Sequence, residues 1–341
     1  MYYKQLDGLR AFAVIAVIIH HWINPSFQYA HWFHYGAHGV DLFFVLSGFL
    51  ITNILIHQRE KEQFQLIDGL KKFYIRRTIR IFPIYYLVML FMLIFVPTAI
   101  KEQLPWLLTY QYNNHIFFFD WQLPAYIHHL WTLSIEEQFY LIWPFVVFLL
   151  PPRKSFYAIC TIIFASIITC ALLYRLNPQL PYSQFTLSSF SGLAIGGLLA
   201  LLRHKQIVIH NRKFLLIFSF LLFVYLSSPY LHFTGKSFLK VLVPLPAILS
   251  FLIISKGIEG YKGFIGRVLE NNFLVFVGKI SYGLYLYHMF IPYNTTHFIG
   301  NYHLSVGTIA MINVAFLLIV SVVSWFLIEK PLNNLKAKFN Y

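Results

Sequence analysis

The stretch 6–21, LDGLRAFAVIAVIIHH, sets the character of the chain, because it is an apolar run with an arginine near its start and two histidines at its end. Ionisable groups inside a membrane segment are costly and commonly functional. At about 100° per residue, His21 lies within about 20° of Arg10 around a helix, whereas His20 lies about 80° away. His21 would also lie about 16 Å deeper. We expect His21 to work with Arg10, although a histidine at a helix end can also simply reach the headgroup layer.

The composition is that of a membrane protein. Of the 341 residues, 58% are hydrophobic and 11% are charged, and the mean hydropathy is +0.64. A soluble domain of this size could not cover so much apolar surface. The net charge of +14 does not indicate nucleic-acid binding, because the basic residues fall in the gaps between apolar runs. Cys160 and Cys170 share one apolar run, so a disulfide framework is not expected.

Ten apolar runs predict an all-α integral membrane protein with about ten transmembrane helices. The runs cover residues 6–23, 40–56, 81–100, 130–150, 157–174, 185–202, 214–231, 238–254, 276–293 and 308–328. With a cytoplasmic N-terminus, all but four of the 26 Lys and Arg residues fall inside; the four are Lys101, Arg175, Lys236 and Lys240. This bias predicts that both termini are cytoplasmic. No linker or second domain is evident, so residues 1–341 are expected to form a single membrane-embedded domain.

The outer loops are poor in charge but rich in His, Tyr, Trp and Asn. Aromatic rings with polar handles suit the faces and hydroxyls of sugars, although membrane-interface belts use the same residues. His31, His34 and His38 also suggest a metal site. No cysteine or carboxylate pattern completes such a site, so no metal is expected.

The second run has an acid at its outer mouth, Asp41, and two small residues, Ser47 and Gly48, in mid-membrane. Small residues at depth usually allow close helix packing, which accounts for Gly48. An acid at the entrance of a span needs a partner. A histidine across the mouth, such as His21, would supply one.

The segment 76–83, RRTIRIFP, is the sharpest basic cluster, and its proline suggests the start of a helix. Arg77 and Arg80 are three residues apart, so they share a helix face at the cytoplasmic boundary. Positive-inside anchoring on anionic lipid explains such a pair. A phosphate clamp is the alternative, because the planar guanidinium suits phosphate better than an ammonium does.

The fourth run carries adjacent carboxylates, Glu136 and Glu137, in an apolar helix. Tyr140 lies one turn after Glu136 on the same face, and Thr132 lies one turn before it. A buried carboxylate can orient a histidine or a substrate hydroxyl, or bridge arginines.

The ninth run begins at a Gly-Lys pair that contains Lys279 and continues with a polar stripe. The stripe consists of Ser281, Tyr282, Tyr285 and His288. Such a stripe can line a cavity or form a hydrogen-bonded packing surface, and the spacing alone leaves both open.

Six stretches together resemble the acyltransferase-3 family of membrane O-acyltransferases. They are LDGLRA with its later histidine, GVDLFFVLSGFLIT, RRTIRIFP, LWTLSIEEQFYLIWP, GKISYGLYLYH and the terminal EKP, and they follow the family order over nearly the whole chain. The family's arginine-x10-histidine pattern falls on Arg10 and His21. The resemblance implies a multi-pass protein of the bacterial cytoplasmic membrane. It would move an acyl group, usually acetyl, from cytoplasmic acetyl-CoA to a carbohydrate at the outer face, such as a surface polysaccharide.

The residues and the resemblance together predict three sets of site residues. The catalytic set is His21, Asp41 and Glu136, in which His21 acts as general base or transient acyl acceptor while a carboxylate fixes its tautomer. The set that holds the CoA phosphates is Arg10, Arg77, Arg80 and Lys279. The set that supplies oxyanion donors or positions the substrate is Ser47, Glu137, Tyr140, Ser281, Tyr282, Tyr285 and His288.

The expected partners are acetyl-CoA, an extracytoplasmic glycan and the lipid bilayer. Many members of this family carry a hydrolase-like domain after the membrane part. This chain ends at Tyr341, so we expect the membrane domain to suffice, or to work as an oligomer or with a separate extracytoplasmic partner. The alternative class is a secondary transporter of a sugar or organic anion, because intramembrane His, Glu and Arg also form relays. The lack of an evident internal repeat and the basic cluster at one mouth favour the enzyme.

Overall fold

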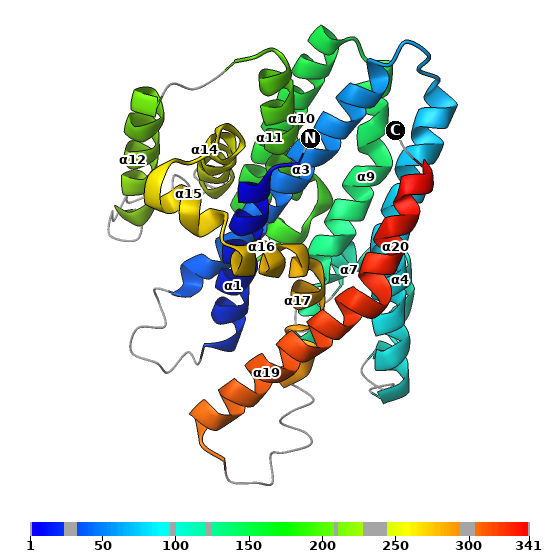
Figure 1. The fold of residues 1–341 in the computed structure, drawn as a ribbon, viewed down its shortest axis with the longest axis vertical. Coiled ribbons are helices and arrows are strands. Elements are labelled where there is room, and N and C mark those ends of the chain that lie inside the picture. The colour runs from blue at the N-terminus through cyan, green and yellow to red at the C-terminus, as the bar shows by residue number, and fades with distance from the viewer. Residues whose placement is uncertain are drawn as a thin grey trace.

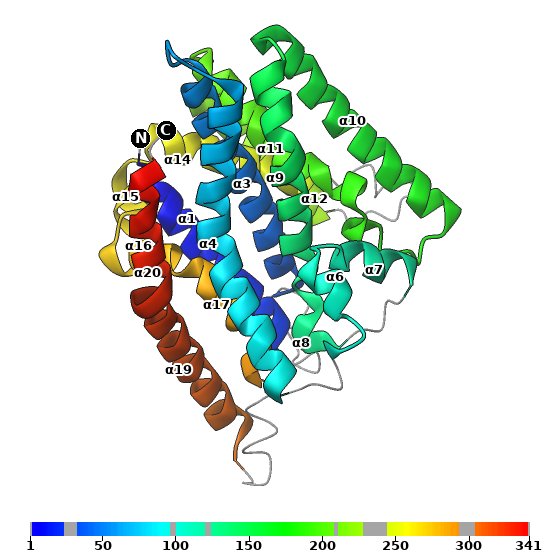
Figure 2. The ribbon, with the colours of Figure 1, turned by 90° about the vertical axis from the view of Figure 1, so that its right-hand side faces the viewer.

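The computed structural model describes residues 2–23, 33–95, 100–119, 124–207, 211–227, 244–292 and 304–339. These residues form helices and connecting turns and contain no strand, as the composition predicts. The long helices run side by side, and both chain termini lie at the same end of the bundle, as does the α3–α4 connection (Figures 1 and 2).

The helices differ widely in length. The elements of the first half are α1 (Lys4–Trp22), η1 (His34–His38), α3 (Gly39–Arg59), α4 (Leu66–Phe95), α6 (Leu104–Leu108), α7 (Tyr112–Phe118), α8 (Ala125–His128), α9 (Trp131–Leu149) and α10 (Pro152–Leu176). Those of the second half are η2 (Tyr182–Gln184), α11 (Thr186–His204), α12 (Asn211–Ser227), α14 (Leu245–Glu259), α15 (Gly263–Leu269), α16 (Asn272–Lys279), α17 (Ser281–Tyr287), α19 (Val306–Ser324), the π-helical turn η3 (Trp325–Glu329), α20 (Lys330–Leu335) and η4 (Lys336–Phe339).

Five helical stretches among the described residues are long and apolar enough to cross a membrane, so the chain is an integral membrane protein. They are Tyr35–Arg59, Leu66–Ile94, Pro152–Leu176, Thr186–His204 and Val306–Leu335. The other five predicted runs overlap α1, α9, α12, α14 and the α16–α17 pair, which are shorter or carry charged residues. Residues 228–231, 238–243 and 293 of these runs lie outside the part of the chain that the structure describes.

Two predicted elements are wrong in detail. The ninth run is not one continuous helix, because it breaks at Ile280 into α16 and α17. Discontinuous helices are tolerated at membrane depth where they line a cavity or are covered by protein. The segment 76–83 does not open a helix either. It lies inside α4, which begins at Leu66 and continues through Pro83.

The tightest helix pair is α3 with α11, and glycines allow it. A Cβ at Gly48 would overlap the Leu193 carbonyl, and a Cβ at Gly196 would overlap the Val45 carbonyl. Only glycine lets the two backbones come this close, which increases dispersion contacts between the helices. The predicted packing role of Gly48 is confirmed.

A polar network fixes the short helices α6 and α7 to the bundle. Gln138 of α9 donates to the Tyr110 carbonyl at 2.6 Å and to Asn113 Oδ1 at 2.9 Å. Asn113 Nδ2 donates to the Gln184 carbonyl at 2.9 Å, and Thr186 donates to Gln138 Oε1 at 2.7 Å. These bonds satisfy side chains that burial would otherwise leave without partners.

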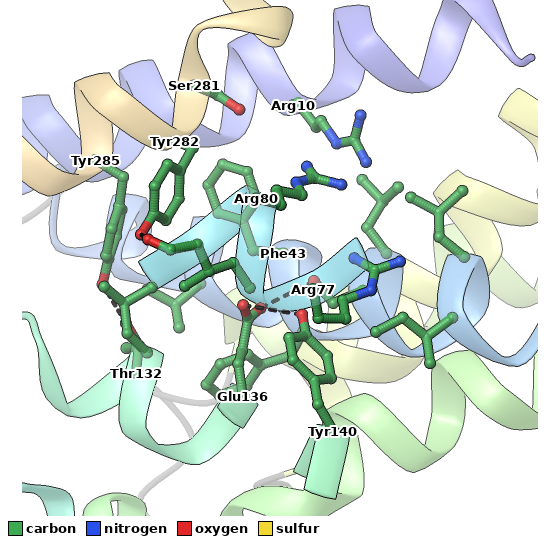
Figure 3. Close-up of a pocket in the computed structure, with 18 residues that line it drawn as sticks. Arg10, Phe43, Arg77, Arg80, Thr132, Glu136, Tyr140, Ser281, Tyr282 and Tyr285 are labelled. Carbon is green, nitrogen blue, oxygen red and sulfur yellow. Dashed lines mark hydrogen bonds between the residues drawn. The ribbon is translucent and has the colours of Figure 1, made fainter. Parts of the chain in front are cut away.

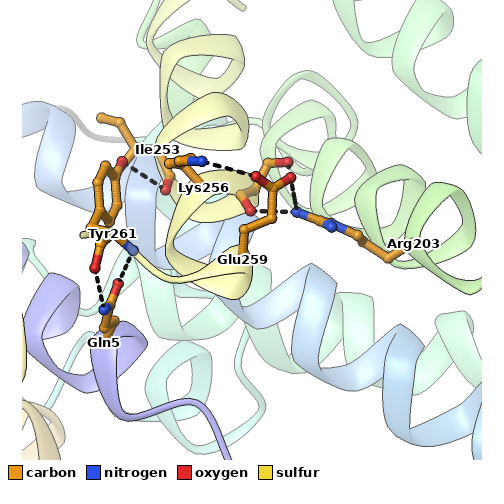
Figure 4. Close-up of polar contacts among 7 residues, drawn as sticks. Gln5, Arg203, Ile253, Lys256, Glu259 and Tyr261 are labelled. Atoms are coloured by element: carbon orange, nitrogen blue, oxygen red, sulfur yellow. Dashed lines mark hydrogen bonds and ion pairs between the residues drawn. The ribbon is translucent and has the colours of Figure 1, made fainter. Parts of the chain in front are cut away.

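The start of α1 is held by the chain that follows α14 (Figure 4). Gln5 Nε2 donates to the Tyr261 carbonyl at 3.1 Å, and Tyr261 N–H donates to Gln5 Oε1 at 2.7 Å. At the end of α14, Glu259 bridges Arg203 of α11 at 2.7 Å and Lys256 at 3.1 Å. This clamp fixes the helix that carries Arg10 and His21.

Candidate active site

A cavity with about 820 Å³ of empty space lies between α1, α3, α4, α9 and α17. We call it the arginine pocket. Its polar wall consists of Arg10, Ser47, Arg77, Arg80, Thr132, Glu136, Tyr140, Ser281, Tyr282 and Tyr285. In Figure 3 Arg10 and Arg80 lie in the upper part of the cavity, Arg77 lies beside Tyr140, and Glu136 and Thr132 lie below. The sequence separates these residues by up to 275 positions, and the fold brings them together.

Arg10 reaches the arginine pocket from the first turns of α1. Its guanidinium forms a 2.7 Å ion pair with the buried Asp7, which also accepts a 2.7 Å hydrogen bond from the Tyr2 hydroxyl. Burial and the neighbouring Asp7 raise the pKa of Tyr2 to about 12, so Tyr2 remains a hydrogen-bond donor at neutral pH. The ion pair therefore fixes the direction of Arg10.

Helix α4 supplies the other two arginines. The guanidinium of Arg77 lies over the rings of Phe73 and Tyr140, at 5.7 Å and 5.6 Å from their centroids. Arg80, one turn further, keeps an exposed side chain that lines the cavity. Arg76 has a different role, because it donates to the carbonyls of Lys336 and Phe339 at 2.8 Å and 3.1 Å and so holds the C-terminal turn.

The field at this end of the molecule is strongly positive. Lys336 begins η4, just beyond the last membrane-spanning stretch. Burial, followed by the nearby charges of Arg80, Arg77 and Arg76, lowers the pKa of its ammonium group to about 6. Glu329 acts in the opposite direction but is outweighed. Three arginines and one glutamate act on Lys336, so the net charge around it favours a polyanion.

Glu136 is held on the opposite wall by two hydroxyl donors. Ser47 Oγ donates to Glu136 Oε1 at 2.9 Å, and the Tyr140 hydroxyl donates to Oε2 at 3.1 Å (Figure 3). The predicted Glu136–Tyr140 face is therefore confirmed as a contact. The hydroxyl hydrogens of Ser47 and Tyr140 are both engaged by the carboxylate.

A second cavity, with about 1130 Å³ of empty space, adjoins the first. We call it the histidine pocket. It is lined by His20, His21, Ala37, His38, Val40, Asp41, Phe44, His128, His129, Trp131, Thr132, Cys170, Ser183, Gln184, Ser188, Ser189, Ser191, Gly192 and Tyr285. Helix α1 thus contributes Arg10 to one cavity and His21 to the other.

His21 is oriented by backbone and by another histidine. Its Nδ1 lies 2.9 Å from the Val17 carbonyl and 3.2 Å from Nε2 of the buried His288. His288 Nδ1 lies 2.6 Å from the Tyr285 carbonyl. Carbonyls accept only, so both Nδ1 atoms carry hydrogens and His288 Nε2 is an acceptor. His21 Nε2 therefore keeps its lone pair for chemistry.

The two pockets share one wall, formed by Val40, Phe44, Thr132 and Tyr285. The Thr132 and Tyr285 hydroxyls lie 2.8 Å apart, and the Tyr285 hydroxyl also donates to the His129 carbonyl at 3.2 Å. The arginine pocket and the histidine pocket therefore meet at this wall.

Several predicted site residues do not make the contacts that the sequence suggests. Neither Asp41 nor Glu136 orients His21; Asp41 instead bonds Nδ1 of His38 at 2.8 Å, because both project from the junction of η1 and α3. Lys279 is not part of either pocket wall, and its ammonium lies over the Tyr2 ring at 5.9 Å.

Glu137 and His288 are also absent from both pocket walls. Glu137 follows Glu136 on α9, and a step of about 100° turns it away from the arginine pocket. His288 is fully buried behind His21. His31 and the side chain of His34 fall outside the part of the chain that the structure describes.

One wall of the histidine pocket was not predicted from the sequence. This wall comes from η2 and the start of α11 and contains Ser183, Gln184, Ser188, Ser189 and Ser191. The run SQFTLSSFS at 183–191 was a usable signal, because so many hydroxyls at the start of a span indicate a polar surface.

Fold and site define a multi-pass helical membrane protein with a cationic cavity next to a histidine-lined one. The acyltransferase domain model, Acyl_transf_3, matches residues 3–330. The chain therefore belongs to the acyltransferase-3 family, as the six motifs predict.

Similar proteins include peptidoglycan O-acetyltransferase OatA of Listeria monocytogenes, 31% identical, over 98% of this chain and 56% of that protein. Putative peptidoglycan O-acetyltransferase YrhL of Bacillus subtilis is 30% identical, over 98% of this chain and 55% of that protein. A putative O-acetyltransferase of Staphylococcus aureus is 30% identical, over 97% and 57%. The chain thus spans little more than half the length of these relatives. No solved structure matches it significantly.

Proposed function

We propose that the protein transfers an acetyl group from cytoplasmic acetyl-CoA to a hydroxyl of an extracytoplasmic glycan. The observation that carries this proposal is the shared wall between the arginine pocket and the histidine pocket. The names of the relatives favour a cell-wall glycan, such as peptidoglycan, as the acceptor. The proposal includes about ten membrane crossings, with both termini in the cytoplasm and the arginine pocket facing that side.

The arginine pocket would hold the CoA phosphates. Arg10, Arg77 and Arg80 present planar donors to one cavity, and such forks bind phosphate oxygens in pairs. Apolar residues of α3, including Leu46 and Leu50, line the same cavity and suit the pantetheine arm. Arg77 and Arg80 would thereby act as a clamp rather than as lipid anchors.

His21 would carry out the chemistry at its Nε2 atom. That atom can take the proton of the acceptor hydroxyl or bond to the acetyl carbon. In either case a positive imidazolium forms, and the Nδ1 hydrogen then binds the Val17 carbonyl and His288 more strongly. His288 would be the positioning residue that a carboxylate provides in other triads.

Ser281 would serve as an oxyanion donor if the thioester carbonyl lies on the arginine-pocket side of the shared wall. It lines the arginine pocket and its hydroxyl bonds no other residue in the described part of the chain. The hydroxyls of Ser47, Tyr140 and Tyr282 are engaged by Glu136 and by the Ile81 carbonyl. Glu136 would fix the wall opposite the arginines and balance part of their charge.

The test is acyl transfer in proteoliposomes from labelled acetyl-CoA to peptidoglycan fragments. His21→Ala should abolish transfer, because no other group replaces Nε2, while acetyl-CoA still binds. His204→Ala is the matched control, since His204 pairs with Glu60 at the end of α11, away from both pockets. Full transfer by a correctly inserted His21→Ala variant would refute the assignment. Uptake of a sugar or organic anion without CoA, with no labelled glycan, would identify a transporter instead.

A further inference from the structure

A second histidine in the histidine pocket has a carboxylate partner. His38, the last residue of η1, places Nδ1 2.8 Å from Oδ2 of Asp41, in the first turn of α3. The two side chains are 41% and 31% exposed, and both line the cavity. The pair is thus accessible to a molecule in the pocket, whereas the His288 ring behind His21 is not.

The geometry of this pair is that of an oriented base. A carboxylate only accepts, so the hydrogen of the neutral imidazole lies on Nδ1 and the lone pair on Nε2. The negative Asp41 lies at the N-terminal end of α3, where the helix dipole stabilises it. The Tyr225 ring of α12 packs edge-on against His38, with centroids 5.3 Å apart, and restricts the imidazole.

The junction of η1 and α3 is also fixed against α1. A Cβ at Gly39 would overlap the Ala13 carbonyl and contact the Val17 side chain. The Val17 carbonyl is the group that orients His21. His38 is the neighbour of Gly39 in the chain, so the close backbone contact sets both histidines against the same cavity.

His21 cannot perform two tasks with one atom. If Nε2 bonds to the acetyl carbon, its lone pair is used, and it cannot then remove the proton of the acceptor hydroxyl. The acceptor step therefore needs another base in the same cavity. His38 lines this pocket and bonds a carboxylate, so it has the partner that a general base needs.

We propose that His38 and Asp41 form the general base for the acceptor hydroxyl, while His21 carries the acetyl group. In the first step His21 Nε2 bonds the carbonyl carbon, the carbon–sulfur bond breaks, and CoA leaves as the thiolate. In the second step His38 Nε2 takes the hydroxyl proton, the acceptor oxygen bonds the carbonyl carbon, and the bond to His21 breaks. Asp41 stabilises the resulting imidazolium, which releases its proton to water. This inference rests on the proposed function.

The experiment separates the two steps in full-length protein in proteoliposomes. Exchange of label between acetyl-CoA and free CoA requires only His21, whereas transfer to peptidoglycan fragments requires both histidines. His38→Ala and Asp41→Asn should lower transfer by about 10²- to 10⁴-fold and leave the exchange rate at the wild-type value. Added imidazole should restore part of the transfer by His38→Ala. His57→Ala is the control. His57 lies on α3, the helix that carries Asp41, and its ring bonds the backbone carbonyl of Asn53.

Each outcome decides the inference. Wild-type transfer by His38→Ala, or equal loss of exchange and transfer, would overturn it, as would transfer by the wild type without any exchange. If His38→Ala does not insert, Asp41→Asn keeps the side-chain size and decides alone. Absence of transfer by the wild type would instead refute the proposed function and not the division between the two histidines.

Discussion

At the scale of single residues, the geometry of His21 follows from its neighbours rather than from a carboxylate. Its Nδ1 hydrogen is shared between a backbone carbonyl and the His288 ring, 2.9 Å and 3.2 Å away. A neutral partner fixes the tautomer without neutralising the imidazolium. This arrangement suits an imidazole that carries the acetyl group only briefly. A positively charged acyl imidazolium loses its imidazole more readily than a neutral acyl imidazole does.

His288→Phe should weaken catalysis without weakening donor binding. The change removes one hydrogen bond to His21 but leaves the Val17 carbonyl, so the loss should be about 0.5–1.5 kcal/mol, or about 2- to 10-fold in kcat. Transfer rates at saturating acetyl-CoA and the acetyl-CoA affinity are the measurements. A larger KM with unchanged kcat would show that His288 supports only the donor pocket.

The sequence predicted this site in part. The eleven-residue spacing predicts that Arg10 and His21 share one face of α1, and in the structure Arg10 lines the arginine pocket while His21 lines the histidine pocket. It could not predict that Asp41 bonds His38, because periodicity defines the faces of one helix and not the rotation of a neighbouring one. The turn η1 adds a local geometry that helical spacing does not describe.

At the scale of elements, α4 and the α16–α17 pair depart most from expectation. A proline usually marks a helix end, but Pro83 lies within α4, since packing against neighbouring helices offsets its missing N–H. All three arginines lie on this continuous helix. Arg76 bonds the C-terminal turn, whereas Arg77 and Arg80 line the arginine pocket. The break at Ile280 leaves Ser281 in the cavity wall and Lys279 outside it.

CoA binding should be accompanied by proton uptake at Lys336. Burial and the three arginines hold its pKa at about 6, so at pH 7.5 the side chain is mostly the neutral amine. Phosphates on Arg77 and Arg80 would cancel part of the repulsion, which raises this pKa and binds a proton. Calorimetry in two buffers of different ionisation enthalpy measures the uptake, and Lys336→Met should reduce it. Below pH 6 the difference should vanish, because Lys336 is then already protonated. Equal uptake by both proteins at pH 7.5 would contradict the coupling.

At the scale of the whole molecule, charge distribution and shape agree. The N-terminus, the C-terminus and the α3–α4 connection share one end of the bundle in both views (Figures 1 and 2). The positive-inside bias predicts that this end faces the cytoplasm, as in the proposed topology. The sequence shows how many apolar runs the chain contains. The short helices show that the length of a run does not by itself give the length of the helix that could cross the membrane.

The proposed orientation can be tested across α10. This helix has 25 residues and is about 37 Å long, which is enough to cross the bilayer once, so in the proposed topology its two ends face opposite compartments. In a background with Cys160→Ser and Cys170→Ser, we expect a membrane-impermeant maleimide to label Gln179→Cys in intact cells and Lys154→Cys only after permeabilisation, since both positions are exposed.

In vesicles oriented by these labels, acetyl-CoA should support transfer only from the Lys154 side, and the acetylated glycan should appear on the Gln179 side. Labelling of Lys154→Cys in intact cells would invert the topology. Equal transfer with donor on either side would mean that the two pockets do not connect opposite faces of the membrane.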